Sequence, residues 1–500
     1  MDKSLGIVAI IVLGSTSIAG CGWTGHLQAY AKQASLASSG SASTSASSAR
    51  TTSMVPIRGV IEGFYGHPWT NPERINLFRF MQQENMNTYV YAPKGDPYQR
   101  MDWRLPYPPA KLAQMRTLVN DAKRDHIRFV YSISPGMTGT STAAVRKSIT
   151  YSSPSDRKAL EAKINQLRSI GVNTFMLSFD DIQTTLKPAD QRVDGHDYAR
   201  AQMQLANEID ADERANDPNF QLWLAPTSYY GLTDGPYWQT LRSTLKRTIK
   251  VIWTGKWVLN KSINSAQAKA VTKLIGRKPI LWDNYPVNDY TYDVGRRPQL
   301  MMGPLQGRSG SLQNNIAGYI SNPMIQPYAS QLALQTIADY LQDPTGYHPK
   351  TAWENAIQHM PGVTNPQLFE AFAAFNTASI LNPSGYSPMR SLISAYENAS
   401  STSSKNSATK ALETEFARLA RLPRTLPPTI TNKALLHEIQ PWLTKLGEEG
   451  QGGLDAIAVL QHPSTTNRAR LSQQIHTVEA SPYKIGGSII TFMQWAKSRR

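Results

Sequence analysis

The chain has 500 residues, of which 40% are hydrophobic and 18% charged, so it can bury a large core and is long for a single domain. Its formal net charge of +16 favours anionic binding partners, such as polyanionic cell-wall polymers, acidic glycans or a lipid surface. Nucleic acid is the competing interpretation of that charge. The sequence contains no dense Lys/Arg tract with interleaved aromatic residues, no zinc-finger spacing and no RNA-binding signature, so we expect no nucleic-acid partner.

The first 21 residues have the pattern of a secretion signal. Lys3 precedes a short apolar run that is too brief for a comfortable membrane span and ends in "SIAGC". That ending resembles the bacterial lipoprotein signal, in which the cysteine becomes the lipidated first residue of the mature chain. Cys21 is the only cysteine, which excludes disulfides and thiolate metal clusters within one chain. We expect Cys21 to be the lipid attachment site of an exported, membrane-anchored protein; the alternative is an apolar start with a chance cysteine.

Residues 22–55 are rich in Ser, Ala, Thr and Gly, as in "SLASSGSASTSASSARTTS". Such a segment has too few apolar groups to offset the entropy cost of ordering it. We predict a disordered linker here.

Residues 56–330 alternate between short apolar runs and segments of helical periodicity. The eight strand candidates are "RGVIEGF", "NTYVYAP", "RFVYSISP", "NTFMLSFD", "FQLWLAP", "KVIWT", "PILWDN" and "IAGYISN". Runs that are apolar throughout are typical of strands covered on both faces. Eight βα units predict a closed (β/α)8 TIM barrel, a fold of the α/β class. A doubly wound open sheet is the alternative, but "EGFYGHPW" after the first strand lacks the glycine spacing of a phosphate loop.

Residues 331–500 lose the strand signal. Leu334, Ile337 and Leu341 have helical spacing, as do Trp353, Ile357 and Met360. This pattern predicts an α-helical bundle domain. The polar patch "ENASSTSSKNSATK" is interpreted as a loop between helices.

The carboxyl ends of the predicted strands carry the candidate chemistry, because those ends face the active site of such a barrel. Asp180 and Asp181 end the fourth strand, and carboxylates, amides and aromatic rings end the others. A ring of such groups without a His or Cys cluster suits a sugar. Two alternatives remain: an oxygen-ligand metal site using Asp180, Asp181, Asp283 and Asp289, or a helix N-cap at "DDIQTT".

Seven motifs give the chain a specific resemblance. They are, in order, "RGVIEGFYGHPW", "NTYVYAPKGDPY", "LSFDDI", "LAPTSYY", "WTGKWV", "WDNYPVNDY" and "GYISNP", spread over about 265 residues. Their order and spacing resemble the catalytic domain of glycoside hydrolase family 84, the retaining β-N-acetylglucosaminidases that include O-GlcNAcases and bacterial enzymes often labelled hyaluronidases. The resemblance implies a glycosidase that needs no cofactor or metal and acts on a glycan or glycoprotein with terminal N-acetylglucosamine (GlcNAc).

The resemblance also implies roles by position. Asp180 would orient and polarise the N–H of the substrate's 2-acetamido group, and Asp181 would be the general acid and then the base. Tyr229 and Trp282 would enclose the acetamido group. The positions that match the family's sugar pocket are Gly63, Tyr65, Lys94, Tyr229, Thr254, Val258, Trp282, Asn284, Asp289 and Asn322. Of these, Asp289 and Asn322 would hold sugar hydroxyls.

The adjacency of Asp180 and Asp181 favours this chemistry on physical grounds. Ordinary retaining enzymes place two carboxyls on opposite sides of the anomeric carbon, about 5 to 5.5 Å apart. Consecutive residues have Cα atoms about 3.8 Å apart and normally project to opposite faces of a strand, so spanning a sugar that way is awkward. In substrate-assisted catalysis the acetamido oxygen attacks and forms an oxazoline, so the protein needs only to position and protonate. Two close carboxyls also resist a second charge, which suits one as acid and the other as anion.

The sequence departs from the family pattern at three points. Lys256 stands where many members have proline, Trp257 where they often have a basic residue, and Ala225 where several have cysteine. Many bacterial members also carry a folded domain before the barrel, where this chain has its low-complexity segment.

We expect an exo-β-N-acetylglucosaminidase that acts through an oxazoline. An endo-acting, hyaluronan-degrading enzyme and a non-catalytic glycan-binding barrel are the alternatives. A chitinase-like enzyme is disfavoured because its spaced strand-four acids ending in glutamate are missing.

Overall fold

The computed structural model describes residues 54–138, 141–385 and 389–499. The predicted signal, Cys21 and the linker up to residue 53 lie outside the described residues. No helix in the described part of the chain combines the length and the apolar character that crossing a membrane requires.

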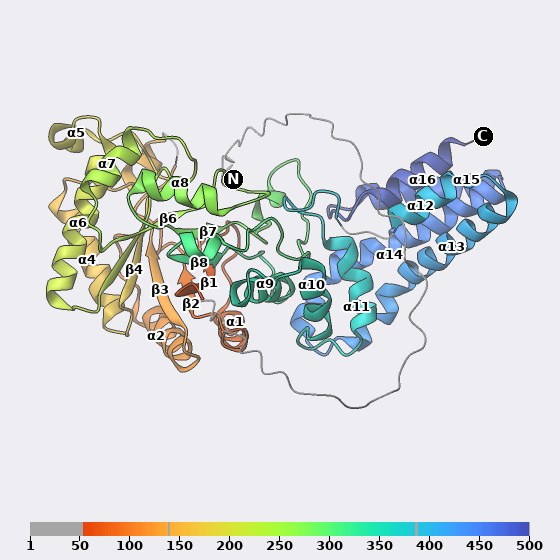
Figure 1. Cartoon of the computed structure of the whole chain (residues 1–500), viewed down its shortest axis with the longest axis horizontal. Helices are drawn as coiled ribbons and strands as arrows, with labels where there is room; N and C mark the ends of the chain where they lie inside the picture. Colours follow the sequence, from red (N-terminus) through yellow and green to blue (C-terminus); the bar gives the residue numbers. More distant parts are fainter. Residues whose placement is uncertain (1–53, 139–140, 386–388, 500) are drawn as a thin grey trace, which may run out of the picture. The chain divides into compact units, whose positions relative to one another are not determined.

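Eight parallel strands close into a barrel in chain order, and the eighth pairs with the first (Figure 1). All eight lie within or over the apolar runs that predicted them, so the TIM-barrel prediction is confirmed. The strands are β1 (Ile57–Glu62), β2 (Thr88–Tyr91), β3 (Arg128–Ile133), β4 (Thr174–Ser178), β5 (Gln221–Ala225), β6 (Lys250–Trp253), β7 (Ile280–Asp283) and β8 (Gly318–Ser321).

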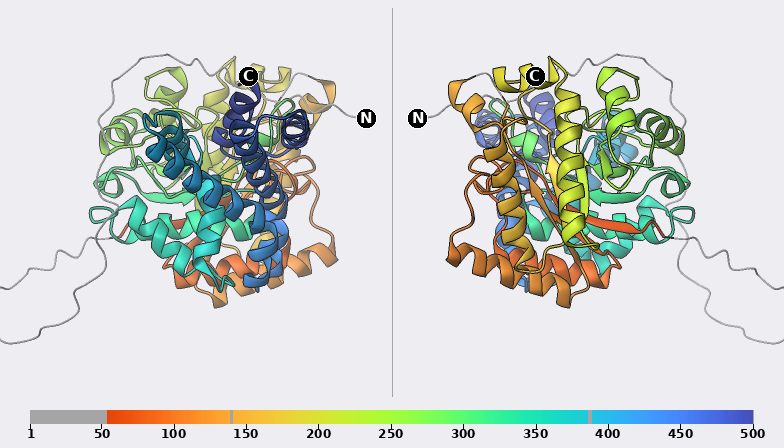
Figure 2. Two further views of the ribbon diagram at one scale, coloured as in Figure 1. Left: turned by 90° about the vertical axis from the view of Figure 1, so that its right-hand side faces the viewer. Right: turned by 90° about the vertical axis from the view of Figure 1, so that its left-hand side faces the viewer.

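Helices cover the outside of the barrel (Figure 2). They are α1 (Asn71–Gln83), α2 (Pro109–Arg124), α3 (Thr142–Lys147), α4 (Pro154–Arg168), α5 (Pro188–Asp194), α6 (Tyr198–Asn216), α7 (Pro236–Thr244), α8 (Ser265–Ile275) and α9 (Pro327–Gln342). The connection between β7 and β8 differs from the expected βα pattern. Among its residues, all of which are described, it has only two 3-10 turns, η1 (Asp289–Tyr292) and η2 (Leu312–Asn315). Repeated Pro and Gly residues, such as Pro298 and Gly307, interrupt this stretch.

Side chains alternate between the barrel interior and the helix layer. Met176 belongs to a cluster inside the barrel, whereas Phe175 and Leu177 pack among the surrounding helices. Ser178 also points inward, where its hydroxyl lies 2.7 Å from that of Ser132. This two-residue period carries on toward the mouth of the barrel and directs Asp180 to the inside.

The remaining helices form the predicted bundle: α10 (Pro349–Gln358), α11 (Pro366–Ala373), α12 (Met389–Glu397), α13 (Thr402–Thr425), α14 (Lys433–Gln461), α15 (Thr465–Ala480) and α16 (Ser488–Ser498), with 3-10 turns η3 (Ala374–Asn376) and η4 (Pro427–Thr429). The predicted boundary at 330/331 falls inside α9, which packs beside both α1 and α14. Glu438 of α14 accepts hydrogen bonds from the backbone N–H groups of Tyr328 and Ala329 at the start of α9. The bundle thus caps the last barrel helix.

The prediction of a loop over residues 397–410 is wrong for most of that patch. Only residues 398–401 separate α12 from α13. Ser401 caps α13 by accepting a hydrogen bond from the N–H of Ser404, and Thr409 and Leu412 are buried on one face. A Ser/Thr-rich sequence can therefore begin a helix where it supplies the cap and where tertiary packing follows.

Candidate active site

The backbone turns sharply between the two aspartates that follow β4. Phe179 still follows the sheet, since its N–H donates to the carbonyl of Ala225 at 2.8 Å. Asp181 has a φ of +51°, in the left-handed region that residues other than glycine rarely adopt. This turn replaces the strand geometry that would send adjacent side chains to opposite faces. The next helix, α5, begins only at Pro188, so the helix N-cap interpretation of "DDIQTT" is wrong.

Asp180 is buried and paired with Lys94. The ammonium of Lys94 lies 2.6 Å from Oδ2 of Asp180, and both side chains are almost fully shielded from solvent. Oδ1 of Asp180 is buried without a hydrogen-bond partner among the described residues. A buried carboxylate oxygen without a partner costs free energy, which a ligand N–H at this point would recover.

Asp181 is held by two phenols. The hydroxyl of Tyr65 donates to Oδ2 at 2.8 Å and that of Tyr229 donates to Oδ1 at 3.2 Å. Burial and the nearby Asp181 charge raise the pKa of both phenols far above the usual range. Both tyrosines therefore remain protonated donors at any physiological pH, and they aim the carboxylate of Asp181.

Arg100 also helps to position the Asp181 carboxylate. The sequence motifs did not predict this residue. One nitrogen of its guanidinium donates to the Tyr65 hydroxyl at 2.9 Å and another to the backbone carbonyl of Asp181 at 2.8 Å. The guanidinium also lies 5.4 Å from the centre of the Tyr65 ring. Arg100 thus holds both the unusual backbone of Asp181 and the phenol that orients it. The only sequence signal was its place just after the matched motif "NTYVYAPKGDPY".

Trp282 forms a wall of the site against the backbone of Gly63. A Cβ atom at Gly63 would lie 2.4 Å from the Trp282 ring, so only glycine allows this approach. The indole Nε1 is buried without a partner among the described residues. Lys94 lies 5.8 Å from the ring centre, which links Trp282 to the ion pair with Asp180.

Two asparagines join neighbouring strand ends. Asn322 accepts the N–H of Gly63 at 3.2 Å and donates to the side-chain carbonyl of Asn284 at 2.9 Å. Asn284 in turn donates to the backbone carbonyl of Val258 at 2.9 Å. Thr254, on the same loop as Val258, is buried, and its N–H donates to the carbonyl of Tyr229. Hydrogen bonds therefore connect the predicted pocket residues from β5 round to β1.

Asp289 lies on the other side of Tyr65. Its two carboxylate oxygens accept the backbone N–H groups of Tyr65 at 2.8 Å and Tyr290 at 2.7 Å. Burial raises the pKa of Asp289. Its remaining lone pairs suit a hydroxyl donor from a ligand. In this way hydrogen bonds or ring contacts join all ten predicted pocket residues and both aspartates in one network.

Two other carboxylates at strand ends form ion pairs with arginines outside this site. Asp283 faces outward and binds Arg308 through both oxygens at 2.7 Å, and Tyr319 donates to it as well. Glu62 binds Arg74 of α1 in the same two-pronged way. Asp283 is therefore not available to the metal site considered above. No group of three or more metal-ligating side chains occurs in the part of the chain that the structure describes.

The three departures from the family pattern lie at the same end of the barrel. Ala225 is buried inside the barrel. Trp257 is 58% exposed, and the ammonium of Lys256 lies 5.3 Å from its ring centre. The loop after β6 therefore presents an indole to solvent next to Val258, one of the predicted pocket residues.

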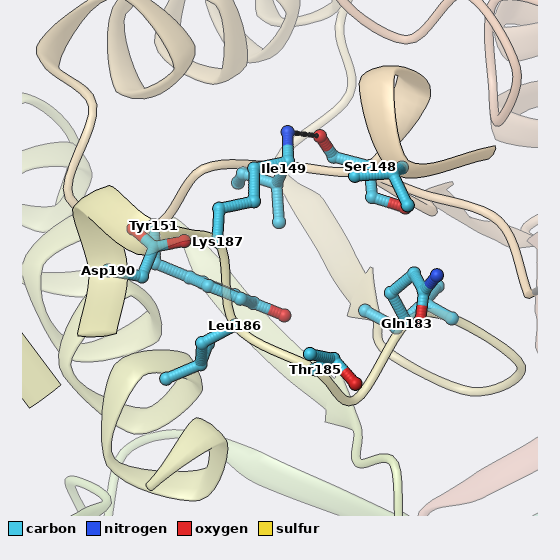
Figure 3. Close-up of a pocket in the computed structure, with 10 residues that line it drawn as sticks. Ser148, Ile149, Tyr151, Gln183, Thr185, Leu186, Lys187 and Asp190 are labelled. Atoms are coloured by element: carbon cyan, nitrogen blue, oxygen red, sulfur yellow. Dashed lines mark hydrogen bonds between the residues drawn. The ribbon is translucent and has the colours of Figure 1, made fainter. Parts of the chain in front are cut away.

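A small cavity lies behind the segment that follows Asp181 (Figure 3). It has a volume of about 10 Å³ and is lined in part by Ile182, Lys187 and Asp190. At its edge the ammonium of Lys187 donates to the carbonyl of Ser148 at 2.6 Å (Figure 3). This space fits about one water molecule, not a sugar ring.

Comparison with known families agrees with this geometry. Residues 58–377 match the model of the beta-N-acetylglucosaminidase family, and residues 388–486 match a domain described as hyaluronidase post-catalytic domain-like. The chain belongs to the beta-N-acetylglucosaminidase family. Glycoside hydrolase family 84, the resemblance carried by the seven motifs, is confirmed.

Relatives of this beta-N-acetylglucosaminidase family member cover different shares of the chain. The curated proteins named Protein O-GlcNAcase from Rattus norvegicus and Mus musculus are each 36% identical over 288 residues, which is 56% of this chain and 29% of theirs. The chain therefore matches less than a third of the length of these curated relatives.

Solved structures extend the likeness into the bundle. An O-GlcNAc hydrolase mutant from Thermobaculum terrenum has 29% identity and a TM-score of 0.80, covering 88% of this chain and 94% of that one. The structure of CpGH84B has 28% identity and a TM-score of 0.75, covering 88% and 77%.

Proposed function

We propose that the protein is a retaining exo-β-N-acetylglucosaminidase that removes terminal β-linked GlcNAc by substrate-assisted catalysis. The observation that carries the proposal is that two adjacent aspartates have different hydrogen-bond partners. Asp180 has one buried oxygen without a partner, whereas two phenols that stay protonated orient Asp181. Family membership supports the hydrolase class.

In the first step the acetamido oxygen attacks C1 and the bond between C1 and the glycosidic oxygen breaks. The free Oδ1 of Asp180 accepts the acetamido N–H, which becomes more acidic as positive charge develops on that group. Lys94 keeps Asp180 in place through the other oxygen. Asp181 donates its proton to the departing oxygen.

In the second step water opens the oxazoline. Asp181, now a carboxylate, removes a proton from the water that attacks C1, and the bond between C1 and the acetamido oxygen breaks. The nitrogen regains from Asp180 the proton that Asp180 took as the neutral oxazoline formed. Two inversions at C1 give the β-anomer.

The matching experiment measures hydrolysis of aryl N-acetyl-β-glucosaminides by the purified protein, with the anomer of the released sugar followed by NMR. We expect the β-anomer first and inhibition by a thiazoline that mimics the oxazoline. Release of the α-anomer, or activity that the thiazoline leaves untouched, contradicts the mechanism. No release at any pH from 4 to 8 favours the glycan-binding barrel, and shortening of polymeric hyaluronan favours the endo-acting alternative.

The acid role of Asp181 has its own test. Replacing Asp181 by Asn should lower kcat/KM by about 10² to 10⁴ for poor leaving groups. Activated aryl leaving groups depart without a proton, so they should lose much less. Equal losses across the series contradict the assignment of Asp181 as the acid.

We also propose that the protein is exported and anchored through lipid on Cys21, where it meets extracellular glycans and anionic cell-wall polymers. The support is the sequence "SIAGC" and the net charge of +16. Cell fractionation compares the native chain with Cys21→Ser. We expect the native chain in the membrane fraction and the variant in the soluble fraction; the same distribution for both contradicts the anchor.

A further inference from the structure

The loops after β5 and β6 each carry an exposed aromatic side chain near the proposed catalytic pair. Tyr230, on the loop after β5, is 44% exposed, and Trp257, on the loop after β6, is 58% exposed. We call these two residues the aromatic platform. Exposed large rings carry a free-energy cost in water, and at the edge of an active site they are typical of ligand contacts.

The two loops form one connected unit. The N–H of Gly231 donates to the carbonyl of Gly255, and the N–H of Thr254 donates to the carbonyl of Tyr229, both at 2.9 Å. The buried indole of Trp253 donates to the carbonyl of Gly231 at 3.1 Å. Tyr230 and Trp257 are therefore carried by a single hydrogen-bonded support.

The backbone of Trp257 is held by hydrogen bonds, while its indole is exposed to solvent. Asn260 accepts the N–H of Trp257 at 2.9 Å and donates to its carbonyl at 2.7 Å, and the hydroxyl of Thr254 donates to the same carbonyl at 3.2 Å. A surface that is rigid before binding loses little entropy when a ligand arrives. The loop after β6 thus holds its indole in place for a contact outside the sugar pocket.

The platform adjoins the proposed acid. Tyr229 donates to Asp181, and the ring centres of Tyr229 and Tyr230 are 5.4 Å apart. Asp181 must reach the glycosidic oxygen, so the atoms beyond that oxygen, the aglycone, lie on the side of Asp181. The aglycone therefore leaves the pocket near the platform.

We propose that Tyr230 and Trp257 form an aglycone subsite for a sugar ring, so that the enzyme prefers GlcNAc linked to another sugar over GlcNAc linked to a peptide. The inference rests on the proposed function and names its substrate class. The C–H face of a pyranose packs on aromatic rings, which is what the platform offers.

The backbone of the platform argues against a peptide aglycone. Peptides in extended conformation gain affinity from main-chain hydrogen bonds to the protein. Here the N–H groups of Gly231, Thr254 and Trp257 already donate within the loops. The two rings and the nearby ammonium of Lys256 provide stacking surface, and these three N–H groups are not available to a peptide.

The test compares kcat/KM for three substrates: an aryl GlcNAc glycoside, a disaccharide with GlcNAc β-linked to a neutral hexose, and a peptide carrying GlcNAc on serine. We expect the disaccharide to be preferred to the peptide. In Trp257→Ala and Tyr230→Ala the ratio of disaccharide to aryl glycoside should fall by about tenfold, whereas Trp257→Phe, which keeps a ring, should retain most of it. The matched control is Leu105→Ala, because Leu105 is 55% exposed on the loop after β2 and should not change the ratio.

The outcomes separate this inference from the proposed function. An active native enzyme whose substrate ratio is unchanged in Trp257→Ala and Tyr230→Ala overturns the subsite alone. A preference for the peptide that depends on the same two rings also overturns it. Absence of GlcNAc release from all three substrates overturns the proposed function and, with it, the subsite. Thermal unfolding of each variant identifies any loss due to misfolding, in which case Trp257→Phe and a Tyr230→Leu variant decide the question.

Discussion

Lys94 and Asp180 form a buried ion pair in which one carboxylate oxygen is paired at 2.6 Å and the other has no partner among the described residues. This arrangement holds a negative charge where the side chains are shielded from solvent, and in the proposed mechanism the second oxygen is left for the substrate. Removing one partner of a buried pair leaves an uncompensated charge, which is more harmful than losing an exposed pair.

The first prediction follows from that pair. Replacing Lys94 by Met should lower kcat/KM on an aryl GlcNAc glycoside by about 10² or more, because Asp180 loses both its position and its charge partner. Lys273→Met is the matched control, since Lys273 is exposed on α8 and should keep full activity. Steady-state kinetics decides the matter, and equal activity of the two variants contradicts the role given to Lys94.

The second prediction concerns Arg100 as a positioning residue. Arg100→Met removes the hydrogen bonds to the Tyr65 hydroxyl and to the Asp181 carbonyl. We expect kcat to fall by about 10 to 100-fold with a smaller change in KM, because misplaced catalytic groups slow the chemical step. The basic limb of the pH profile of kcat should also move to higher pH, since loss of a nearby cation favours protonated carboxyls.

Arg100→Lys is the companion variant. It keeps the charge and loses the two-pronged geometry, so the pH profile should stay near that of the native enzyme while kcat remains reduced. A loss of stability without any change in the pH profile would show that Arg100 has a structural role only.

The third prediction concerns the contact between Gly63 and Trp282. Gly63→Ala places a methyl group where the Trp282 ring now lies, 2.4 Å from its nearest atom. The ring must move, and if it moves into the proposed sugar pocket KM should rise by about tenfold or more. Gly235→Ala is the matched control, because a Cβ there meets no atom within 4 Å. Unchanged KM in Gly63→Ala would mean that Trp282 does not line the sugar pocket.

The sequence could predict the barrel because its strands are buried on both faces and leave continuous apolar runs. It could also predict where Asp180 and Asp181 lie, since both directly follow one such run. What it could not predict is the left-handed backbone of Asp181, which depends on a loop residue 81 positions away, Arg100, donating to its carbonyl.

Side-chain direction explains why some strand-end carboxylates do not join the site. Asp283 and Glu62 stand at strand ends like the site residues, but each faces the helix layer and binds an arginine there. The two-residue alternation along each strand contained this information. The start of α13 was missed because a Ser/Thr tract has low helix propensity, and only burial of Thr409 and Leu412 reveals the helix.

The fourth prediction concerns Glu449, a buried carboxyl on α14. Its Oε2 has no partner among the described residues, and Gly453 on the same helix lets α14 approach Phe416 of α13 so closely that water has little access. Burial raises the pKa of Glu449 to about 8, whereas an unfolded chain has an ordinary value of about 4.3. Between these values the native state keeps a proton that the unfolded state has lost. The contribution of protonated Glu449 to the free energy of unfolding is therefore fully present below the pKa of the unfolded chain. It is lost progressively as the pH rises toward 8, the pKa in the folded protein.

Denaturant unfolding at pH values from 5 to 8 measures this effect. The free energy of unfolding should fall with pH with a contribution from Glu449 of at most about 1.4 kcal/mol per pH unit. Glu449→Gln cannot ionise, so it should flatten the dependence and be more stable than the native chain near pH 8. Glu397→Gln, an exposed change on α12, should leave the dependence as it is. A Glu449→Gln variant with the native slope would show that this carboxyl stays ionised in the folded bundle, which requires a cation such as the neighbouring Lys445 to compensate its burial.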